Sequence, residues 1–295
     1  MLGKLLVKIV GPTIKNHLRA FYHRRKHDFV CTFLSYGSDE LAKALLRLGV
    51  QKGDTILLHS AFETSSGFTG SPEDVIDVFL DAVGTGGNLL MVSLAYLSSS
   101  YDYLKNLKCF DVRKTISRMG LISESFRRRK DVLRSLHPTH PVLACGPQAE
   151  WIVRNHEQCL APCGAGTPFE KLALLNGKVF FFDTPFASFT FFHYLEDLVK
   201  DKLPFPLYCA EPFAVEVVDH EGRRSVVKTL VFSPSAIQRR RFGILETEFW
   251  NKGLIKTARI GNSKILSIEV QSAIACALKM FDRGRYFYDV TEPVS

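Results

Sequence analysis

Several patterns that this sequence lacks exclude whole classes of protein. The seven cysteines are odd in number and irregularly spaced, so they form neither a disulfide framework nor a zinc-ligand pattern. No apolar run reaches the roughly 18 residues of a membrane-spanning helix, because Asp183 and Pro185 interrupt the Phe-rich run at 179–192. Internal repeats and a Pro- or Gly-rich linker are also absent. These absences predict a cytoplasmic protein with reduced thiols and one main domain.

Positive charge is concentrated at the beginning of the chain. Residues 1–30 hold seven Lys or Arg and one acid, whereas the rest of the chain is close to neutral. Leu5 and Ile9 share this segment with Lys4 and Lys8, which predicts a basic amphipathic, helical extension over residues 1–35 before a domain at 36–295. Lys8 also interrupts the apolar core that a secretory signal needs.

Two interpretations of this extension stay open. Residues 1–30 can lie on an anionic surface, which would place the protein peripherally at the inner membrane face. Alternatively, they form a helix packed on the body or on a second subunit of a homodimer. The basic run at 24–26 is too short to predict nucleic-acid binding.

Residues 54–94 have the pattern of a βαβ unit. An apolar strand at 55–58 is followed by a Ser-, Thr- and Gly-rich loop at 61–70. Ser71, Pro72, Glu73 and Asp74 then form a strong helix start, with a cap, a proline in the first turn and two acids. A second apolar strand follows at 88–94, and parallel strands joined by a helix are typical of α/β proteins.

The second half of the chain adds more strands and helices. The turn at Asn176 and Gly177 precedes a fully apolar strand at 178–182, a pattern typical of a strand buried on both faces. Segments 213–219 and 226–232 predict a hairpin around residues 219–222. Two helices, at 243–251 and 263–281, are predicted to close the body. The fold class is therefore α/β with a single domain.

Three functional side chains follow the buried strand 178–182. Ser188 is a candidate cap for a helix that carries Thr190, His193 and Glu196, spaced three residues apart and so on one face. A hydroxyl, an imidazole and a carboxylate just past a strand end are a common arrangement for an α/β site. The alternative is that His193 is a buried structural histidine beneath an aromatic cap.

Five strings occur in order along residues 38–219, at 48–60, 110–111 with 117–120, 134–140, 164–168 and 190–196. This arrangement resembles the aminoglycoside 3-N-acetyltransferase family, also called the antibiotic N-acetyltransferase family. The resemblance implies an α/β/α sandwich with a mixed central sheet. It also implies an acyltransferase that uses acetyl-coenzyme A, without a metal, to acetylate a small-molecule amine on a sugar.

The same resemblance implies the catalytic residues. His193 matches the family's catalytic histidine, which takes a proton from the amine. Glu196 matches an acid that orients the ring and stabilises the imidazolium. Thr190 is expected to donate a hydrogen bond to the thioester oxygen as charge develops there.

The resemblance further implies two groups of binding residues. The coenzyme is expected beside the loop after the first strand and the string at 134–140. These positions are His59, Ser60, Thr64, Ser65, Ser66, Gly67, Arg134 and Ser135. The acceptor is expected near His137, His140 and Asp183.

Two departures from the family pattern concern the acceptor. Ala187 stands where the family usually has an Asp, and Phe189 where it usually has an Asn. The mildly basic body also suits a polycationic drug poorly. We therefore expect a nucleotide- or glycan-linked amino sugar, whose phosphates would suit the arginine runs at 127–129 or 239–241. The alternatives are an aminoglycoside acetyltransferase that confers antibiotic resistance and a non-catalytic, membrane-recruited scaffold. A cysteine hydrolase is disfavoured, because no cysteine lies at a recognisable strand-to-helix elbow.

Overall fold

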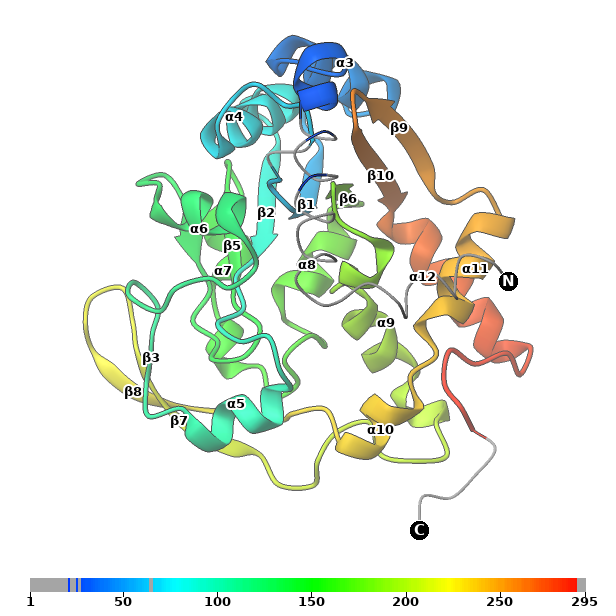
Figure 1. Ribbon diagram of the computed structural model, residues 1–295. Coiled ribbons are helices and arrows are strands. Elements are labelled where there is room, and N and C mark those ends of the chain that lie inside the picture. Colours follow the sequence, from blue (N-terminus) through cyan, green and yellow to red (C-terminus); the bar gives the residue numbers. More distant parts are fainter. Residues whose placement is uncertain (1–20, 22–24, 26–27, 64–65, 291–295) are drawn as a thin grey trace.

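The computed structural model describes residues 21, 25, 28–63 and 66–290, and its centre is a mixed seven-stranded sheet (Figure 1). The strand order is β4-β5-β2-β1-β6-β10-β9. The strands are β1 (Thr55–Ser60), β2 (Asn88–Val92), β4 (Leu133–Arg134), β5 (Val142–Cys145), β6 (Lys178–Phe182), β9 (Lys256–Ile260) and β10 (Ser263–Glu269). The helices of eight or more residues are α3 (Ser38–Arg47), α4 (Pro72–Val83), α6 (Leu121–Arg128), α9 (Phe192–Val199), α11 (Phe242–Asn251) and α12 (Val270–Asp282). Shorter helices are α5 (Ser100–Asn106), α7 (Ala149–Val153), α8 (Pro168–Leu174) and α10 (Pro234–Arg239).

The parallel centre of the sheet confirms the predicted βαβ unit. Strand β1 pairs in parallel with β2 on one side and with β6 on the other. Helix α4 connects β1 to β2, and the Ser71 hydroxyl accepts a hydrogen bond from the Asp74 backbone N–H at its start. Ser60 and Phe182 are register partners, so β1 and β6 end at the same edge of the sheet. That edge is where α/β proteins usually place a site.

Two separate apolar cores cover the two faces of this sheet. On one face Ile56, Phe180 and neighbouring residues pack against α3, α4 and α6. On the other face Leu57, Phe181 and their neighbours pack against α8, α9 and α12. Because both faces are covered, the central strands can be apolar throughout. The α/β/α sandwich with a mixed sheet is confirmed.

The predicted helix at 263–281 is wrong over its first seven residues. Strand β9, a turn at Gly261 and Asn262, and strand β10 form an antiparallel hairpin, and helix α12 begins only at Val270. The apolar positions Ile265 and Ile268 fit a helical spacing as well as a buried strand, which explains the error. A two-residue Gly-Asn turn between apolar segments is a hairpin signal that favours the observed structure.

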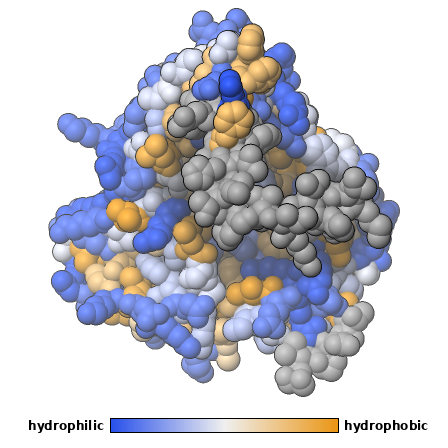
Figure 2. Space-filling model, viewed as in Figure 1, coloured by the Kyte–Doolittle hydropathy of each residue, from blue (hydrophilic) through white to orange (hydrophobic). Residues whose placement is uncertain are grey.

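A second, three-stranded sheet lies apart from the first, in the order β3-β7-β8. It contains β3 (Phe110–Asp111), β7 (Phe213–Val218) and β8 (Arg224–Thr229), and its hairpin confirms the predicted one. Figure 1 shows this sheet on the same side of the molecule as α6. In Figure 2, hydrophilic residues cover much of the same view, with hydrophobic residues in separate small groups between them.

A close approach of two glycines gives a test of the packing between β2 and β5. Gly146 has φ +128°, and a Cβ there would overlap the carbonyl oxygen of Gly87 and lie 2.7 Å from Asn88 Oδ1. Gly146→Ala is therefore expected to lower the free energy of unfolding by about 2–3 kcal/mol in urea denaturation. Gly243→Ala is the matched control, because a Cβ at Gly243 has nothing within 4 Å. Equal stability of the two variants would contradict the packing described here.

The predicted extension at 1–35 lies mostly outside the described residues. Its final part, 28–33, is helical, with Phe29 and Phe33 exposed. Within the described ranges, no helix is both long and apolar enough to cross a bilayer. The boundary between extension and domain stays a prediction.

Candidate active site

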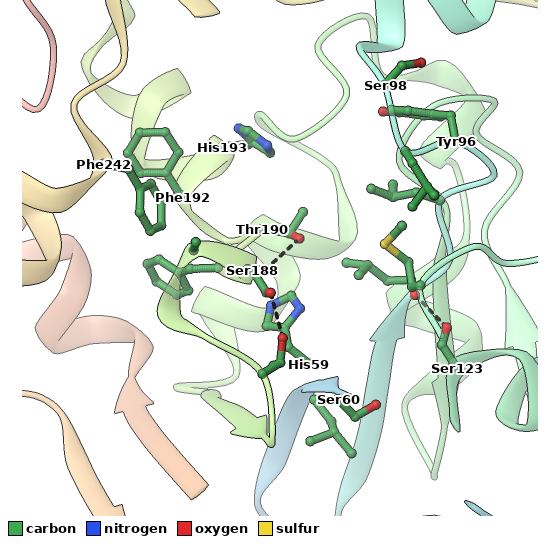
Figure 3. Close-up of a pocket in the computed structure, with 18 of the residues that line it drawn as sticks. His59, Ser60, Tyr96, Ser98, Ser123, Ser188, Thr190, Phe192, His193 and Phe242 are labelled. Carbon is green, nitrogen blue, oxygen red and sulfur yellow. Dashed lines mark hydrogen bonds between the residues drawn. The ribbon is translucent and has the colours of Figure 1, made fainter. Parts of the chain in front are cut away.

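A cavity of about 620 Å³ lies at the edge where β1 and β6 end (Figure 3). Phe242, Phe192, His193, Thr190 and Ser188 lie on one side of it in Figure 3, and Tyr96, Ser98 and Ser123 lie on the other. His59 and Ser60 come from the end of β1. The cavity is mainly apolar with a few polar groups, as ligand sites usually are.

The segment after β6 forms one wall of this cavity, and its local structure corrects one prediction. Ser188 belongs to a short 3-10 helix, Phe186–Ser188, and α9 begins only at Phe192. Ser188 therefore does not cap α9, and its hydroxyl is 2.8 Å from that of Thr184. Thr190 precedes the helix, and its hydroxyl donates to the Ser188 carbonyl at 3.3 Å. Phe186 and Phe189 are buried in the core that covers the Phe181 face of the sheet. The chain therefore packs against the sheet before α9 begins.

His193 and Glu196 lie one turn apart on α9 and form a direct pair. The His193 Nδ1 to Glu196 Oε2 distance is 2.7 Å. An ionised carboxylate only accepts hydrogen bonds, so Nδ1 carries the hydrogen and Nε2 keeps a free lone pair. The Glu196 side chain is fully buried, whereas 21% of the His193 side chain is exposed. The ring therefore reaches the cavity while the acid lies behind it.

Two residues far along the chain hold Glu196 in place. Arg240 Nε donates to Glu196 Oε1 at 2.6 Å, and Arg240 Nη2 donates to Oε2 at 2.9 Å. The Tyr288 hydroxyl donates to Oε1 as well. No sequence pattern indicates either contact, because no spacing links residues 240 and 288 to α9. Arg240 also lines the cavity.

These contacts decide the charge states of the pair. Burial would raise the pKa of Glu196, but Arg240 and His193 together hold its pKa below the usual value. Burial lowers the pKa of His193, Glu196 partly opposes that effect, and Arg240 adds to it. The pair is therefore a neutral imidazole beside a carboxylate near neutral pH, which suits a general base.

The pKa of His193 can be measured directly. In an NMR titration of the histidine rings, we expect the His193 ring to become protonated only below pH 6.5, the ordinary value. At neutral pH the ring is then almost entirely neutral and ready to accept a proton. A His193 pKa above 6.5 would contradict this description, because it would mean that Glu196 outweighs burial and Arg240.

The predicted coenzyme residues divide into two groups. His59 and Ser60 line the cavity, and His59 Nε2 is buried without a hydrogen-bond partner among the described residues. Ser66 and Gly67 instead pack under the segment 34–36, where the Gly67 carbonyl accepts from the backbone N–H of residue 36. They do not line the cavity. The predictions for Thr64 and Ser65 lie outside the described residues.

Arg134 and Ser135 also lie away from the cavity. Arg134 donates from Nη2 to the Ser93 carbonyl at 2.7 Å and from Nη1 to the carbonyls of Val112 and Thr115. The Ser135 hydroxyl is 2.8 Å from His156 Nδ1. Both side chains tie loops to the sheet.

The predicted acceptor residues are not in the cavity lining. His140 lies next to the His193–Glu196 pair, with its ring centroid 5.6 Å from that of His193. His137 is further back, stacked on His156 at 4.4 Å. Asp183 turns away and accepts from the Ser263 hydroxyl at 2.6 Å. In the described part of the chain, no group of three or more His, Cys, Asp or Glu could hold a metal ion.

The loop after β2 contributes residues that the sequence analysis did not name. Tyr96 and Ser98 line the cavity from this loop. Met119, just before α6, and Ser123, in the first turn of α6, line it as well. Their place after a parallel strand was the signal that could have identified them. Together with His59 and Ser60, they add hydroxyl and imidazole groups to the largely apolar lining of the cavity.

Aminoglycoside acetyltransferases of known structure share this fold. Aminoglycoside acetyltransferase AAC(3)-IVa has the same fold, with a TM-score of 0.67 and 26% identity, over 84% of this chain and 89% of that one. The structure described as AAC-IIIb binary with CoASH matches with a TM-score of 0.70 and 22% identity, over 88% and 99% of the two chains, which shows the fold alone.

The chain belongs to the aminoglycoside 3-N-acetyltransferase family, whose sequence model matches residues 57–282. Aminoglycoside N(3)-acetyltransferase IV from Salmonella sp is 27% identical over 245 residues, which cover 83% of this chain and 87% of the relative. The resemblance predicted from five short strings is confirmed. The acetyl donor predicted with it, acetyl-coenzyme A, is the co-substrate of these acetyltransferases.

Proposed function

We propose that this protein transfers an acetyl group from acetyl-coenzyme A to an amine of an aminoglycoside or a related amino sugar. The observation that carries the proposal is the His193 imidazole at the cavity wall, backed at 2.7 Å by the buried Glu196. A structural histidine would not need an ionised acid held by an arginine behind it. The geometry therefore favours a base over the alternative of a merely structural histidine.

Each residue of the site has its own part in the reaction. A sugar amine is largely protonated near neutral pH, and it must lose a proton to become a nucleophile. His193 Nε2 accepts that proton, directly or through water, and Glu196 stabilises the imidazolium. The amine nitrogen attacks the thioester carbon, whose oxygen gains negative charge. The C–S bond then breaks, and the imidazolium returns its proton to the departing thiolate, so that the amide and the free thiol of coenzyme A are formed. Thr190 is the proposed donor to the thioester oxygen. Its hydroxyl now makes a long hydrogen bond of 3.3 Å to the Ser188 carbonyl, which it can give up for a bond to the substrate oxygen.

The relatives favour an aminoglycoside acceptor. They are named aminoglycoside N(3)-acetyltransferases, and a histidine-to-alanine variant of AAC(3)-IVa has been solved in complex with a gentamicin. The preference that we predicted for a nucleotide- or glycan-linked amino sugar has no such support. Most of the arginines in the two runs that motivated it pair with acids: Arg127 with Glu124, Arg129 with Asp77, Arg240 with Glu196 and Arg241 with Asp289.

One feature of the cavity makes the acceptor worth testing broadly. No Asp or Glu is among the described residues that line the cavity. Ala187 and Phe189, the two departures from the family pattern, are part of this lining. A polycationic drug usually needs carboxylates to replace its lost hydration. Acceptors with few amines therefore belong in the same panel as gentamicin.

Release of free coenzyme A, followed with a thiol reagent, tests the proposal. The panel is gentamicin, a single-amine hexosamine, and a nucleotide-linked hexosamine, each at equal concentration. We expect at least one aminoglycoside or free amino sugar to give kcat/KM on the order of 10⁴ M⁻¹ s⁻¹. Release that equals the acceptor-free background with every amine would instead favour the non-catalytic scaffold.

Three earlier predictions remain open beside this proposal. Membrane contact concerns residues 1–30, which are mostly outside the described part. The homodimer and the domain boundary near residue 36 likewise stay predictions.

A further inference from the structure

A second cleft, of about 350 Å³, is lined mostly by cationic side chains. It lies where the C-terminal end of α6 meets the loop after β3 and the tip of the β7–β8 hairpin, on the side of the molecule that carries the three-stranded sheet in Figure 1. Its polar lining consists of Arg113, Arg127, Arg128, Arg134 and His220. None of these five residues lines the active-site cavity.

Arg134 forms the base of this cleft and has no carboxylate partner among the described residues. It is 3% exposed, and its two terminal nitrogens donate only to backbone carbonyls. Its Nε is buried without a partner in the same part of the chain. A buried guanidinium without a counter-ion is costly, and burial together with Arg127 lowers its pKa to about 9. An anion in the cleft would remove that penalty.

The acids near the cleft are already engaged. Asp219 and Glu221, on either side of His220, both pair with Arg223. Glu124 accepts two bonds from Arg127 and one from Arg128 Nε, at 2.7 to 2.9 Å. Asp111 accepts from the backbone N–H groups of Arg113 and Lys114, and its Oδ1 lies 3.5 Å from Arg113 Nε. The four arginines of the cleft thus face the two remaining carboxylates, so the cleft carries excess positive charge.

Two arginines can turn further donors toward a ligand. Arg113 and Arg128 have 43% and 69% of their side chains exposed. For Arg128, the carboxylate contact involves Nε and leaves the terminal nitrogens outside that bond. The His220 ring closes one side, where Nε2 donates to the Arg134 carbonyl at 2.8 Å. The hairpin tip is therefore fixed against the cleft.

We propose that this cleft is a binding site for a phosphate group. Guanidinium forks match the oxygens of a compact tetrahedral anion, and several converge here over a buried cation. The phosphate could belong to the coenzyme or to a separate small ligand, and the two sources share this chemistry. The proposal does not rest on the proposed acetyl transfer, because binding is measured without turnover.

Calorimetric titration of the full chain with inorganic phosphate tests the site. The variant is Arg113→Gln with Arg128→Gln, which changes two exposed side chains and keeps Arg134 intact. Each lost charge-assisted bond weakens binding, so we expect an affinity at least about tenfold lower than that of the parent. Arg223→Gln is the matched control, because Arg223 lies in the same hairpin but pairs with Asp219 and Glu221. Its phosphate affinity is expected to equal that of the parent.

A second titration separates the two sources of phosphate. If the site serves the coenzyme, phosphate competes with coenzyme A, and the double variant loses affinity for coenzyme A but not for pantetheine. If the ligand is separate, phosphate binds equally well in the presence of coenzyme A. Either result supports the site. Phosphate binding that is absent at matched ionic strength, or unchanged in the double variant, would overturn it.

Discussion

Replacing His193 with glutamine is expected to lower kcat by about 10²- to 10⁴-fold, the usual contribution of a general base. Glutamine keeps a polar group near Glu196 but cannot accept and hold a proton. The predicted coenzyme-binding residues that line the cavity, His59 and Ser60, lie on β1. The KM for acetyl-coenzyme A is therefore expected to change less than about threefold. Steady-state kinetics with the best acceptor from the panel measure both quantities.

This result has to be separated from simple misfolding. The His193 side chain is partly exposed to the cavity, so the thermal unfolding midpoint of the variant is expected to stay close to that of the parent. A folded variant that acetylates at the parental rate would refute the role of His193 as the base. His193 would then be a structural residue that packs against the rings of Phe192 and Phe232.

Replacing Arg240 with methionine is expected to have the largest effect on stability. The change leaves the fully buried Glu196 carboxylate without its bidentate cation. Breaking such a buried pair from one side usually lowers the free energy of unfolding by about 3–5 kcal/mol. Urea denaturation at pH 7 measures the loss.

The effect of pH gives this prediction a second readout. Glu196 has a folded-state pKa below the ordinary 4.5, so its interactions stabilise the protein above that pH and are lost as the pH falls through the folded value. The stability gap between parent and Arg240→Met should therefore narrow in acid. Adding Glu196→Gln should recover much of the loss at pH 7, because no buried charge is then left alone. A gap that is independent of pH and unrelieved by Glu196→Gln would mean that Arg240 stabilises by packing alone.

The sequence predicted those parts of the fold that local patterns determine. Ser71 and Pro72 give the start of α4 directly, and the apolar run 178–182 gives β6. The segment 263–269 was assigned wrongly because Ile265 and Ile268 suit two periods, and the choice between them depends on pairing with β6, which is a tertiary contact. The spacing of apolar residues within one segment does not indicate which strand that segment will pair with.

The site shows the same division. His193 and Glu196 are three residues apart, so their pairing followed from helix geometry. Arg240 and Tyr288 reach Glu196 from other parts of the chain, so spacing could not identify them. Arg134 is predicted near the coenzyme because its string matches the family, and this stays a prediction. Its side chain lies at the base of the cationic cleft and does not line the active-site cavity. A matching string fixes the backbone position more securely than the direction of the side chain.

The long-range support of Glu196 bears on how the protein is made. Its partners Arg240 and Tyr288 are encoded 44 and 92 residues downstream, so both must be synthesised before the carboxylate can gain these hydrogen bonds. Until then Glu196 lacks the cation that compensates its charge in the folded protein. A chain that stops before residue 240 cannot bury this acid beside its cation, so we expect such a chain to unfold more readily than the full one.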